Sequence, residues 1–283
     1  MDHTEKTAAP FLVSASWLAE HLEDPGIQVI EVAREGEDSS YRAGHIPGAV
    51  LWPWKTVLWH ETDREFPAPE EMGERLGRFG ISSETTVILY GDPVQYATYA
   101  FWVLTMCGHP DIRVLDGTRT RWAAEGRPMS KETPRVERVE YRARPGDTSM
   151  RVGRDEVRAK LGQPGRMMLD VRTPEEYRGE RVSGSSGFDH GAERKGRIPG
   201  AVHLFYREIL NDDDTLKSPE ELRSIFESVG ATPEKEIVIY CRLSHRASFV
   251  WFAMRYILGY ESARIYDGSW TEWGSIVSFP IEK

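Results

Sequence analysis

The chain has 283 residues, of which 40% are apolar, and its 9 Trp, 11 Tyr and 10 Phe can fill one or two sizeable cores. Its formal net charge of −9 argues against general nucleic-acid binding, although an acidic chain can still carry a local basic site for a small anion. Two cysteines exclude a disulfide framework and a zinc pattern. No run approaches the ~18 apolar residues of a membrane span, and no secretory signal is visible. We therefore expect a soluble, cytoplasmic protein that binds neither nucleic acid nor membranes.

The first half alternates short apolar strands with amphipathic helices. After a polar tail of ten residues, the stretch 11–22 predicts a strand and a helix, with Ser14 or Ser16 as the helix N-cap. A turn at Pro25-Gly26 precedes the next strand. Trp52 and Trp54 then form an aromatic segment, which is more often core than binding surface. The expected strands span 27–32, 86–90 and 112–115, and the expected helices span 70–79 and 96–106.

The second half repeats the landmarks of the first in the same order. Ile46-Pro-Gly-Ala-Val50 recurs as Ile198-Pro-Gly-Ala-Val202. The later landmarks are offset by about 150 residues, too long for a solenoid repeat of 20–50 residues. The chain is therefore two copies of one domain. Two further pairs carry this alignment: Ile88-Leu-Tyr90 with Val238-Ile-Tyr240, and Leu115-Asp-Gly117 with Tyr266-Asp-Gly268.

Each copy predicts an α/β domain with a mainly parallel five-stranded sheet and helices on both faces, because short buried strands alternate with helices. We place the N-terminal domain at residues 10–130 and the C-terminal domain at 149–283. The stretch 131–148 between them is charged and contains Pro134, Pro145 and Gly146, as expected of a linker.

One cysteine lies where a functional site is expected. Residues 237–240 read as a buried strand and 247–258 as a helix, so residues 241–246 must turn the chain from one to the other. In a parallel sheet such a turn lies at the carboxyl edge, where sites are usually built. Cysteine reacts as the thiolate, which neighbouring cations and a helix N-terminus favour. Arg242, His245 and Arg246 supply the cations, so the turn suits both a reactive Cys241 and an anionic substrate.

The turn and its flanks resemble the active-site loop of a rhodanese, a sulfurtransferase. The wider match, from Tyr240-Cys241-Arg242 through Tyr266-Asp-Gly-Ser-Trp270, resembles the catalytic half of tandem-domain thiosulfate sulfurtransferases. The resemblance implies an enzyme that carries sulfur as a persulfide on Cys241 and needs no metal or organic cofactor. The predicted substrate-binding residues of the loop are Arg242, Ser244, His245 and Arg246.

The N-terminal copy lacks this chemistry. Aligning Tyr90 with Tyr240 places Gly91 opposite the cysteine, and Asp92-Pro93 follows in place of cations. We therefore expect the first domain to be catalytically silent, as in tandem rhodaneses generally. Cys107 lies near the end of an apolar helical run, which predicts ordinary packing.

The second copy also carries about 13 extra residues between its first long strand and the Ile-Pro-Gly motif. In tandem sulfurtransferases this segment supplies arginines to the substrate anion. Arg194 is placed like the arginine of the family pattern Arg-x-Gly-His-Ile-Pro-Gly, and Arg178 is the second candidate, ahead of Arg181. Arg197 stands where that pattern has histidine, and its role is open between substrate binding and a salt bridge.

Two other motifs predict structural roles. Asp170-Val-Arg172 ends a strand with an acid and a base, which favours an ion pair bracing the loop. Asp267-Gly268 and Asp116-Gly117 occur in both copies, the silent one included, which indicates a turn requirement.

The predicted reaction moves the sulfane sulfur of thiosulfate through the Cys241 persulfide to cyanide or to a small or protein thiol, and releases sulfite. A 3-mercaptopyruvate sulfurtransferase is the nearest alternative. Its loop resembles Cys-Gly-Ser-Gly, whereas Arg242 and Leu243 stand here, and a cationic Arg242 suits a dianion better. A sulfur-binding or regulatory module that does not turn over is a further alternative. Cysteine phosphatases need Cys-x5-Arg, one residue longer than the spacing from Cys241 to Arg246.

Overall fold

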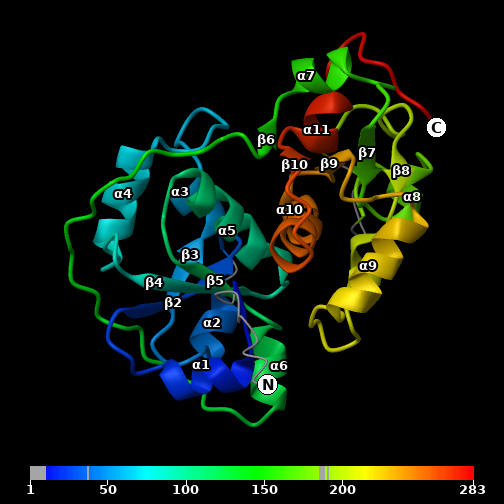
Figure 1. The fold of residues 1–283 in the computed structure, drawn as a ribbon. Coiled ribbons are helices and arrows are strands. Elements are labelled where there is room, and N and C mark those ends of the chain that lie inside the picture. Colours follow the sequence, from blue (N-terminus) through cyan, green and yellow to red (C-terminus); the bar gives the residue numbers. More distant parts are fainter. Residues whose placement is uncertain (1–10, 37, 185–188, 190) are drawn as a thin grey trace, which may run out of the picture. The chain divides into compact units, whose positions relative to one another are not determined.

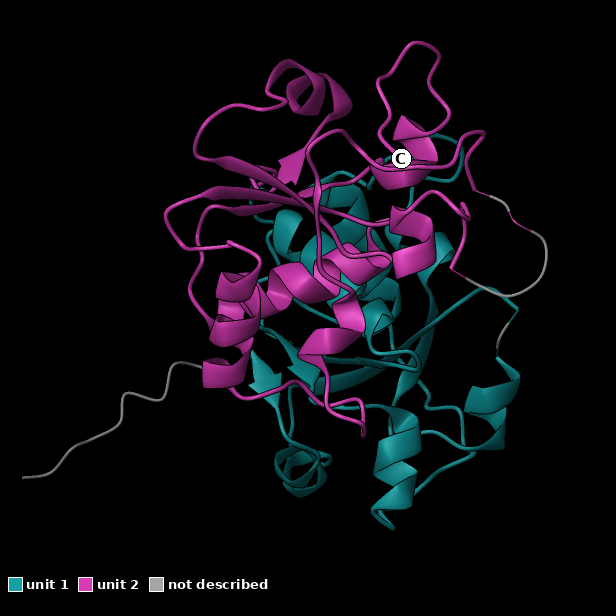
Figure 2. Ribbon diagram, turned by 90° about the vertical axis from the view of Figure 1, so that its right-hand side faces the viewer, with its two compact units in different colours: residues 1–146 teal, residues 147–283 magenta. Residues whose placement is uncertain are grey.

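The computed structural model describes residues 11–36, 38–184, 189 and 191–283. These residues form two compact units that divide after Gly146 (Figure 2). The boundary lies within the stretch 131–148 that was expected to be a linker. Most of that stretch belongs to the first unit, because the Val139 amide donates to the Gly77 carbonyl and the Tyr141 hydroxyl lies 2.9 Å from His109 Nδ1. None of the described helices combines the length and the apolar character needed to cross a membrane.

Each unit holds one sheet of five parallel strands with the same strand order, which confirms the predicted fold class and duplication (Figure 1). The order is β1-β5-β4-β2-β3 in the first unit and β6-β10-β9-β7-β8 in the second. The strands are β1 (Leu12–Val13), β2 (Ile27–Ala33), β3 (Val50–Pro53), β4 (Thr86–Gly91), β5 (Ile112–Leu115), β6 (Arg151–Val152), β7 (Arg166–Asp170), β8 (Val202–His203), β9 (Glu236–Tyr240) and β10 (Ala263–Tyr266).

The helices lie near the predicted positions. Ser14 is the N-cap of α1, because its side chain accepts the Trp17 amide. The helices are α1 (Ala15–His21), α2 (Ser39–Ala43), α3 (Trp54–Leu58), α4 (Pro69–Arg78), α5 (Gln95–Met106), α6 (Arg119–Ala124), α7 (Arg154–Ala159), α8 (Pro174–Tyr177), the 3-10 helix η1 (Tyr206–Ile209), α9 (Pro219–Ser228), α10 (His245–Phe252), the π-helix η2 (Ala253–Ile257) and α11 (Ser269–Trp273).

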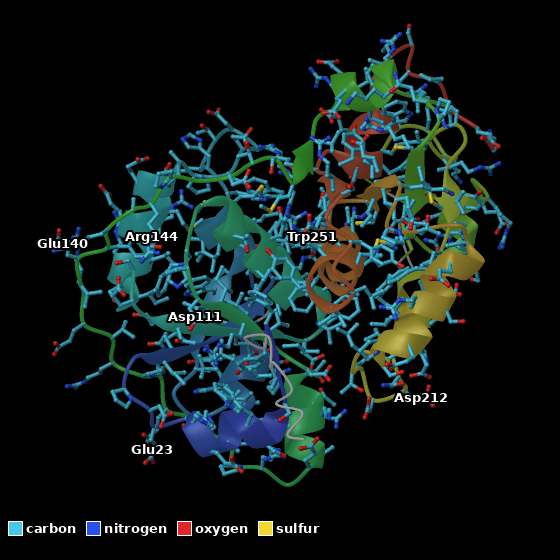
Figure 3. The ribbon with its side chains drawn as sticks, viewed as in Figure 1. Glu23, Asp111, Glu140, Arg144, Asp212 and Trp251 are labelled. Carbon is cyan, nitrogen blue, oxygen red and sulfur yellow. The ribbon has the colours of Figure 1, made fainter. Side chains whose placement is uncertain are left out.

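Helices cover both faces of the second sheet. Val238 and Tyr240 of β9 pack in one buried cluster with Val157 of α7 and Trp270 of α11. The alternate residues of β9 point to the opposite face, which α10 covers (Figure 1). Trp251 of α10, labelled in Figure 3, donates its indole N–H to the Ala263 carbonyl at 3.1 Å and so ties the helix to β10. The helix that follows the cysteine is thus anchored to the sheet.

The continuous helical segment formed by α10 and η2 is one residue longer than α5, its counterpart in the first unit. α5 begins at Gln95 and α10 at His245, and each helical segment is followed by a glycine with positive φ, Gly108 or Gly259. The path from His245 to Gly259 contains one residue more than the path from Gln95 to Gly108. The extra residue therefore falls inside the helix, where the π-helix at Ala253–Ile257 accommodates it. The predicted helix 247–258 thus begins at His245, two residues earlier than expected, and continues into the π turn.

A buried ion pair braces the end of β7, as predicted. Arg172 Nη2 lies 2.6 Å from Asp170 Oδ2, and both side chains are fully buried. The Tyr240 hydroxyl donates to the same carboxylate at 2.6 Å. The residue immediately before Cys241 is therefore held to the neighbouring strand by a charge-assisted hydrogen bond.

The first unit keeps this network but takes its cation from a different element. Glu31 replaces the aspartate, and it accepts from the Tyr90 hydroxyl and from Arg119 Nη1, each at 2.6 Å. Arg119 aligns with Trp270, and the Trp270 ring lies 4.6 Å from the Arg172 guanidinium in the second unit. The two units therefore place the arginine at different sequence positions, and in the second unit these two positions, 172 and 270, are neighbours in space.

Candidate functional site

Cys241 follows β9 directly at the carboxyl edge of the sheet, and only 1% of it is exposed. Two hydrogen bonds tie its backbone to the start of α11. Its amide donates to Ser269 Oγ at 3.2 Å, and its carbonyl accepts from the Trp270 amide at 2.9 Å. The next carbonyl, of Arg242, accepts from the Thr271 amide at 3.2 Å. The loop is therefore fastened to the turn between β10 and α11.

Two serines at this junction adopt backbone conformations that are costly for residues other than glycine. Ser244 has φ 68° and Ser269 has φ 51°, and both are fully buried. The Ser244 hydroxyl donates to the Asp267 carbonyl at 2.6 Å, and the Asp267 carboxylate in turn accepts from Arg151 at 2.9 Å. Because the Ser244 hydroxyl donates to Asp267, it holds the cysteine loop to the turn that contains Asp267. Its contact with a substrate stays a prediction.

Helix α10 begins within the loop. Its first backbone bond runs from the Ser248 amide to the Ser244 carbonyl at 2.7 Å, so the amides of residues 245–247 belong to the first turn. Such amides and the positive end of the helix favour an anion at this point. His245 is the first helical residue and is half-buried, next to the two arginines of the loop.

Arg246 is paired with a carboxylate that sequence reasoning missed. Its Nη1 lies 2.6 Å from Glu176 Oε2 and its Nη2 lies 2.9 Å from Glu176 Oε1, and the Glu176 side chain is fully buried. Burial alone lowers the pKa of Arg246, but the hydrogen bond to Glu176 and the charges of Glu176 and Cys241 raise it above its ordinary value. Arg246 is thus a cation that interacts electrostatically with Cys241. Glu176 largely neutralises the charge of Arg246.

The sequence around Glu176 indicates that this residue caps a helix, but it does not indicate the pairing with Arg246. Thr173 and Glu176 form a capping box at the start of α8, the spacing typical of Ser/Thr-x-x-Glu. The Glu176 carboxylate accepts the Thr173 amide at 3.1 Å in addition to the two arginine bonds. A capping box does not predict a partner in a loop that is distant along the chain.

The arginines predicted before the Ile-Pro-Gly motif have other partners. Arg194 donates to the carbonyls of Trp273, Gly274, Ile276 and Phe279 at 2.6–3.1 Å. Four backbone oxygens thus occupy its guanidinium, which leaves its expected role in substrate binding without structural support. Arg178 is half-exposed and lies 2.6 Å from Glu180. Its predicted role in substrate binding therefore has no structural support either. Arg197 is a salt-bridge partner of Glu282 and lies over the Tyr177 ring.

Cys107 contrasts with Cys241 in its surroundings. It is buried, and its sulfur lies 3.7 Å from the Pro67 carbonyl, in agreement with the prediction of ordinary packing. Burial raises the pKa of the Cys107 thiol to about 12, so this thiol stays protonated at neutral pH. A protonated buried thiol is a poor nucleophile.

The Ser269 hydroxyl is expected to matter for sulfur transfer as well as for stability. Ser269→Ala removes the acceptor of the Cys241 amide, and loss of such a buried bond costs about 1–3 kcal/mol of unfolding free energy. We expect kcat/KM for sulfur transfer to fall by about tenfold because the cysteine loses one of its fixed contacts. Steady-state kinetics and urea denaturation measure the two effects.

The first unit offers a matched control. Thr118 occupies the place of Ser269, but its hydroxyl accepts the Arg121 amide and caps α6. Thr118→Ala is expected to cost about 1 kcal/mol of stability and to leave kcat/KM unchanged. Unchanged kinetics in Ser269→Ala would show that its hydroxyl serves the turn alone.

Comparisons with known proteins agree with this architecture. The rhodanese-like domain family matches the chain twice, over residues 14–125 and 153–276. The sulfur carrier protein TtuD of Thermus thermophilus is 43% identical over 96% of both chains. A protein of Saccharopolyspora erythraea with the name "Putative thiosulfate sulfurtransferase" is 38% identical over 96% of this chain and 95% of its own.

Solved structures of an enzyme of anaerobic ergothioneine biosynthesis are also similar. The Chlorobium limicola enzyme with trimethyl histidine superposes with a TM-score of 0.80 and 28% identity, covering 96% of this chain and 70% of that one. A structure of EanB in a cysteine-persulfide form with ergothioneine has a TM-score of 0.84 and 28% identity, with the same coverage. With both units matched and relatives similar along nearly their whole length, the chain belongs to the rhodanese family of sulfurtransferases, as a tandem pair of rhodanese-like domains.

Proposed function

We propose that this protein is a thiosulfate sulfurtransferase that carries the transferred sulfur as a persulfide on Cys241. The observation that supports this proposal most directly is the loop itself. It presents a cysteine at the carboxyl edge of the sheet, ahead of a helix N-terminus, with Arg242 beside it and Arg246 within its field. Fixed donors and positive charges around a sulfur favour its anionic forms, both thiolate and persulfide.

In the first half-reaction the Cys241 thiolate attacks the outer sulfur of thiosulfate. A bond forms between Sγ and that sulfur, the sulfur–sulfur bond of thiosulfate breaks, and its electron pair leaves with sulfite. Arg242 would bind the sulfonate group and stabilise the departing sulfite. Arg246 contributes less to this binding because the Glu176 carboxylate already faces its guanidinium.

In the second half-reaction an acceptor removes the outer sulfur. Cyanide or a thiolate attacks it, the bond to Sγ breaks, and Cys241 leaves as the thiolate with which the cycle began. Dividing one transfer into two displacements lets the same loop stabilise a small anion in each of them. The acceptor carries the sulfur away as thiocyanate or as a new persulfide.

A sulfur carrier is the second candidate function. The 43% identical relative from Thermus thermophilus is named as one, and a carrier would hand its sulfur to a protein acceptor. Both functions use the Cys241 persulfide, but only the sulfurtransferase turns over with a small acceptor. Repeated sulfite release in the presence of cyanide supports the enzyme, whereas one stoichiometric release supports the carrier.

Intact-protein mass spectrometry after thiosulfate treatment tests the proposal. We expect the protein to gain one sulfur atom, to keep this gain in Cys107→Ser and to lose it in Cys241→Ser. A gain that survives in Cys241→Ser overturns the proposed nucleophile. Sulfite release from thiosulfate is compared with pyruvate release from 3-mercaptopyruvate in the same samples. Faster pyruvate release would reassign the donor and leave the nucleophile unchanged.

A further inference from the structure

The segment between the first long strand and the Ile-Pro-Gly motif is longer in the second unit than in the first. β7 ends at Asp170 and the motif follows at Ile198, whereas β2 ends at Ala33 and the motif follows at Ile46. The described residues of the longer segment are held to their own unit. The Asp189 carboxylate accepts the amides of Val182 and Ser183 at 2.8–3.1 Å, and Lys195 lies 3.4 Å from the same carboxylate. This addition is present in the copy that has the reactive loop and absent from the copy that lacks it.

Two glycines of this segment lie directly against the two arginines of the cysteine loop. A Cβ at Gly184 would lie 2.7 Å from Glu176 Oε2 and 3.4 Å from Arg246 Nη1. A Cβ at Gly191 would lie 2.6 Å from Arg242 Nη1 and 3.2 Å from its Cδ. Distances under ~3 Å are closer than carbon can approach without displacing a neighbour. A side chain at Gly191 would therefore displace Arg242, whereas a side chain at Gly184 would first meet Glu176, the partner of Arg246.

Gly191 is suited to this contact by its backbone as well as by its size. Its φ is 112°, in the region that residues with a side chain rarely adopt. The Arg242 guanidinium therefore lies where a side chain at position 191 would otherwise stand. The atom that a new side chain would meet is the end of a flexible arginine, so a substitution would move the guanidinium rather than prevent folding.

We propose that Gly191 is a specificity-determining position for the sulfur donor, because it sets where the Arg242 guanidinium lies beside Cys241. The inference rests on the proposed function, in which Arg242 binds the anionic part of the donor. A Cβ at Gly191 would lie 2.6 Å from Arg242 Nη1, so the chain at this position limits where the guanidinium can lie. Gly191 acts through Arg242 and is a positioning residue.

Kinetics of Gly191→Ala test the inference on the full-length protein. In a double displacement, kcat/KM for thiosulfate reports only the donor half-reaction and kcat/KM for cyanide reports only the acceptor half-reaction. We expect kcat/KM for thiosulfate to fall by about tenfold, as for one displaced charge-assisted hydrogen bond, mainly through KM. We expect kcat/KM for cyanide to stay at the wild-type value.

A double-mutant cycle and a matched glycine separate this role from a structural one. In the Arg242→Ala background, Gly191→Ala should change kcat/KM for thiosulfate no further. Gly162→Ala is the control, because Gly162 also has positive φ (72°) but has nothing within 4 Å of its Cβ position. It should share the loss of stability and keep wild-type kinetics.

The outcomes distinguish the inference from the function on which it rests. An active wild type whose kcat/KM for thiosulfate is unaltered by Gly191→Ala overturns the inference alone. The same holds if the effect persists undiminished in the Arg242→Ala background. A wild type that gains no sulfur from thiosulfate overturns the donor assignment together with the inference.

Discussion

Glu176→Ala is expected to lower the free energy of unfolding by about 3–5 kcal/mol, because it leaves the Arg246 guanidinium without its carboxylate. The pair has the geometry that makes such a loss large. Two hydrogen bonds join the groups at 2.6 and 2.9 Å, the carboxylate is fully buried, and the guanidinium is 14% exposed. Urea denaturation of the full chain, followed by tryptophan fluorescence, measures the loss.

Two further variants distinguish the buried pair from an ordinary surface contact. Glu175→Ala removes the neighbouring carboxylate, which is 48% exposed and 3.7 Å from Arg178, and should cost less than about 1 kcal/mol. Replacing both partners, as Glu176→Leu with Arg246→Met, should recover most of the stability because no buried charge remains unpaired. A loss below about 1 kcal/mol in Glu176→Ala would mean that Arg246 reaches water or another partner without cost.

The fold could be predicted almost entirely from the sequence because each copy repeats its buried strands and its turns. Apolar runs such as 237–240 have few alternatives to a buried parallel strand, and two copies in the same order support each other. The sequence places helix ends less accurately. The helix predicted from residue 247 begins at His245, and the one-residue offset that its π turn absorbs is too small to notice in the sequence.

The sequence singles out the cysteine loop, but it does not reveal the residues that pair with the loop's arginines. The clustering of Cys241 with Arg242, His245 and Arg246 is local, so it can be read directly from the sequence. The partners of the arginines are not local. Glu176 neutralises Arg246 from a distant part of the chain, and four C-terminal carbonyls bind Arg194, so a count of positive residues overstates the charge that a donor anion would meet.

The same limitation applies to residues that act through the backbone. Ser269 belongs to an Asp-Gly-Ser turn that resembles the Asp-Gly-Thr turn of the first unit. Only its φ of 51° and its bond to the Cys241 amide show that the two hydroxyls serve different purposes. Gly191 is likewise one glycine among 25 until its distance to Arg242 is known. The three-dimensional contacts are therefore needed to tell Ser269 and Gly191 from similar residues elsewhere in the chain.

Arg242→Ala is expected to reduce kcat/KM for thiosulfate by about 10- to 100-fold, because hydrogen bonds to a charged group contribute about 1.5–3 kcal/mol. Arg242→Lys should recover only part of this loss, since an ammonium group cannot make the two parallel bonds of a guanidinium to an oxyanion. Stopped-flow measurement of sulfite release gives the donor half-reaction directly. Raising the ionic strength should weaken thiosulfate binding more in the wild type than in Arg242→Ala.

Arg178→Ala is the matched control, because Arg178 lies in the same unit, is 52% exposed and is paired with Glu180. It should keep the wild-type kcat/KM for thiosulfate. If Arg178→Ala lost as much activity as Arg242→Ala, long-range attraction of the donor by the local positive charges of this unit would explain both, and no specific contact from Arg242 would be needed. If Arg242→Ala alone kept full activity, the backbone amides and the start of α10 would suffice to bind the sulfonate, and Arg242 would have no part in donor recognition.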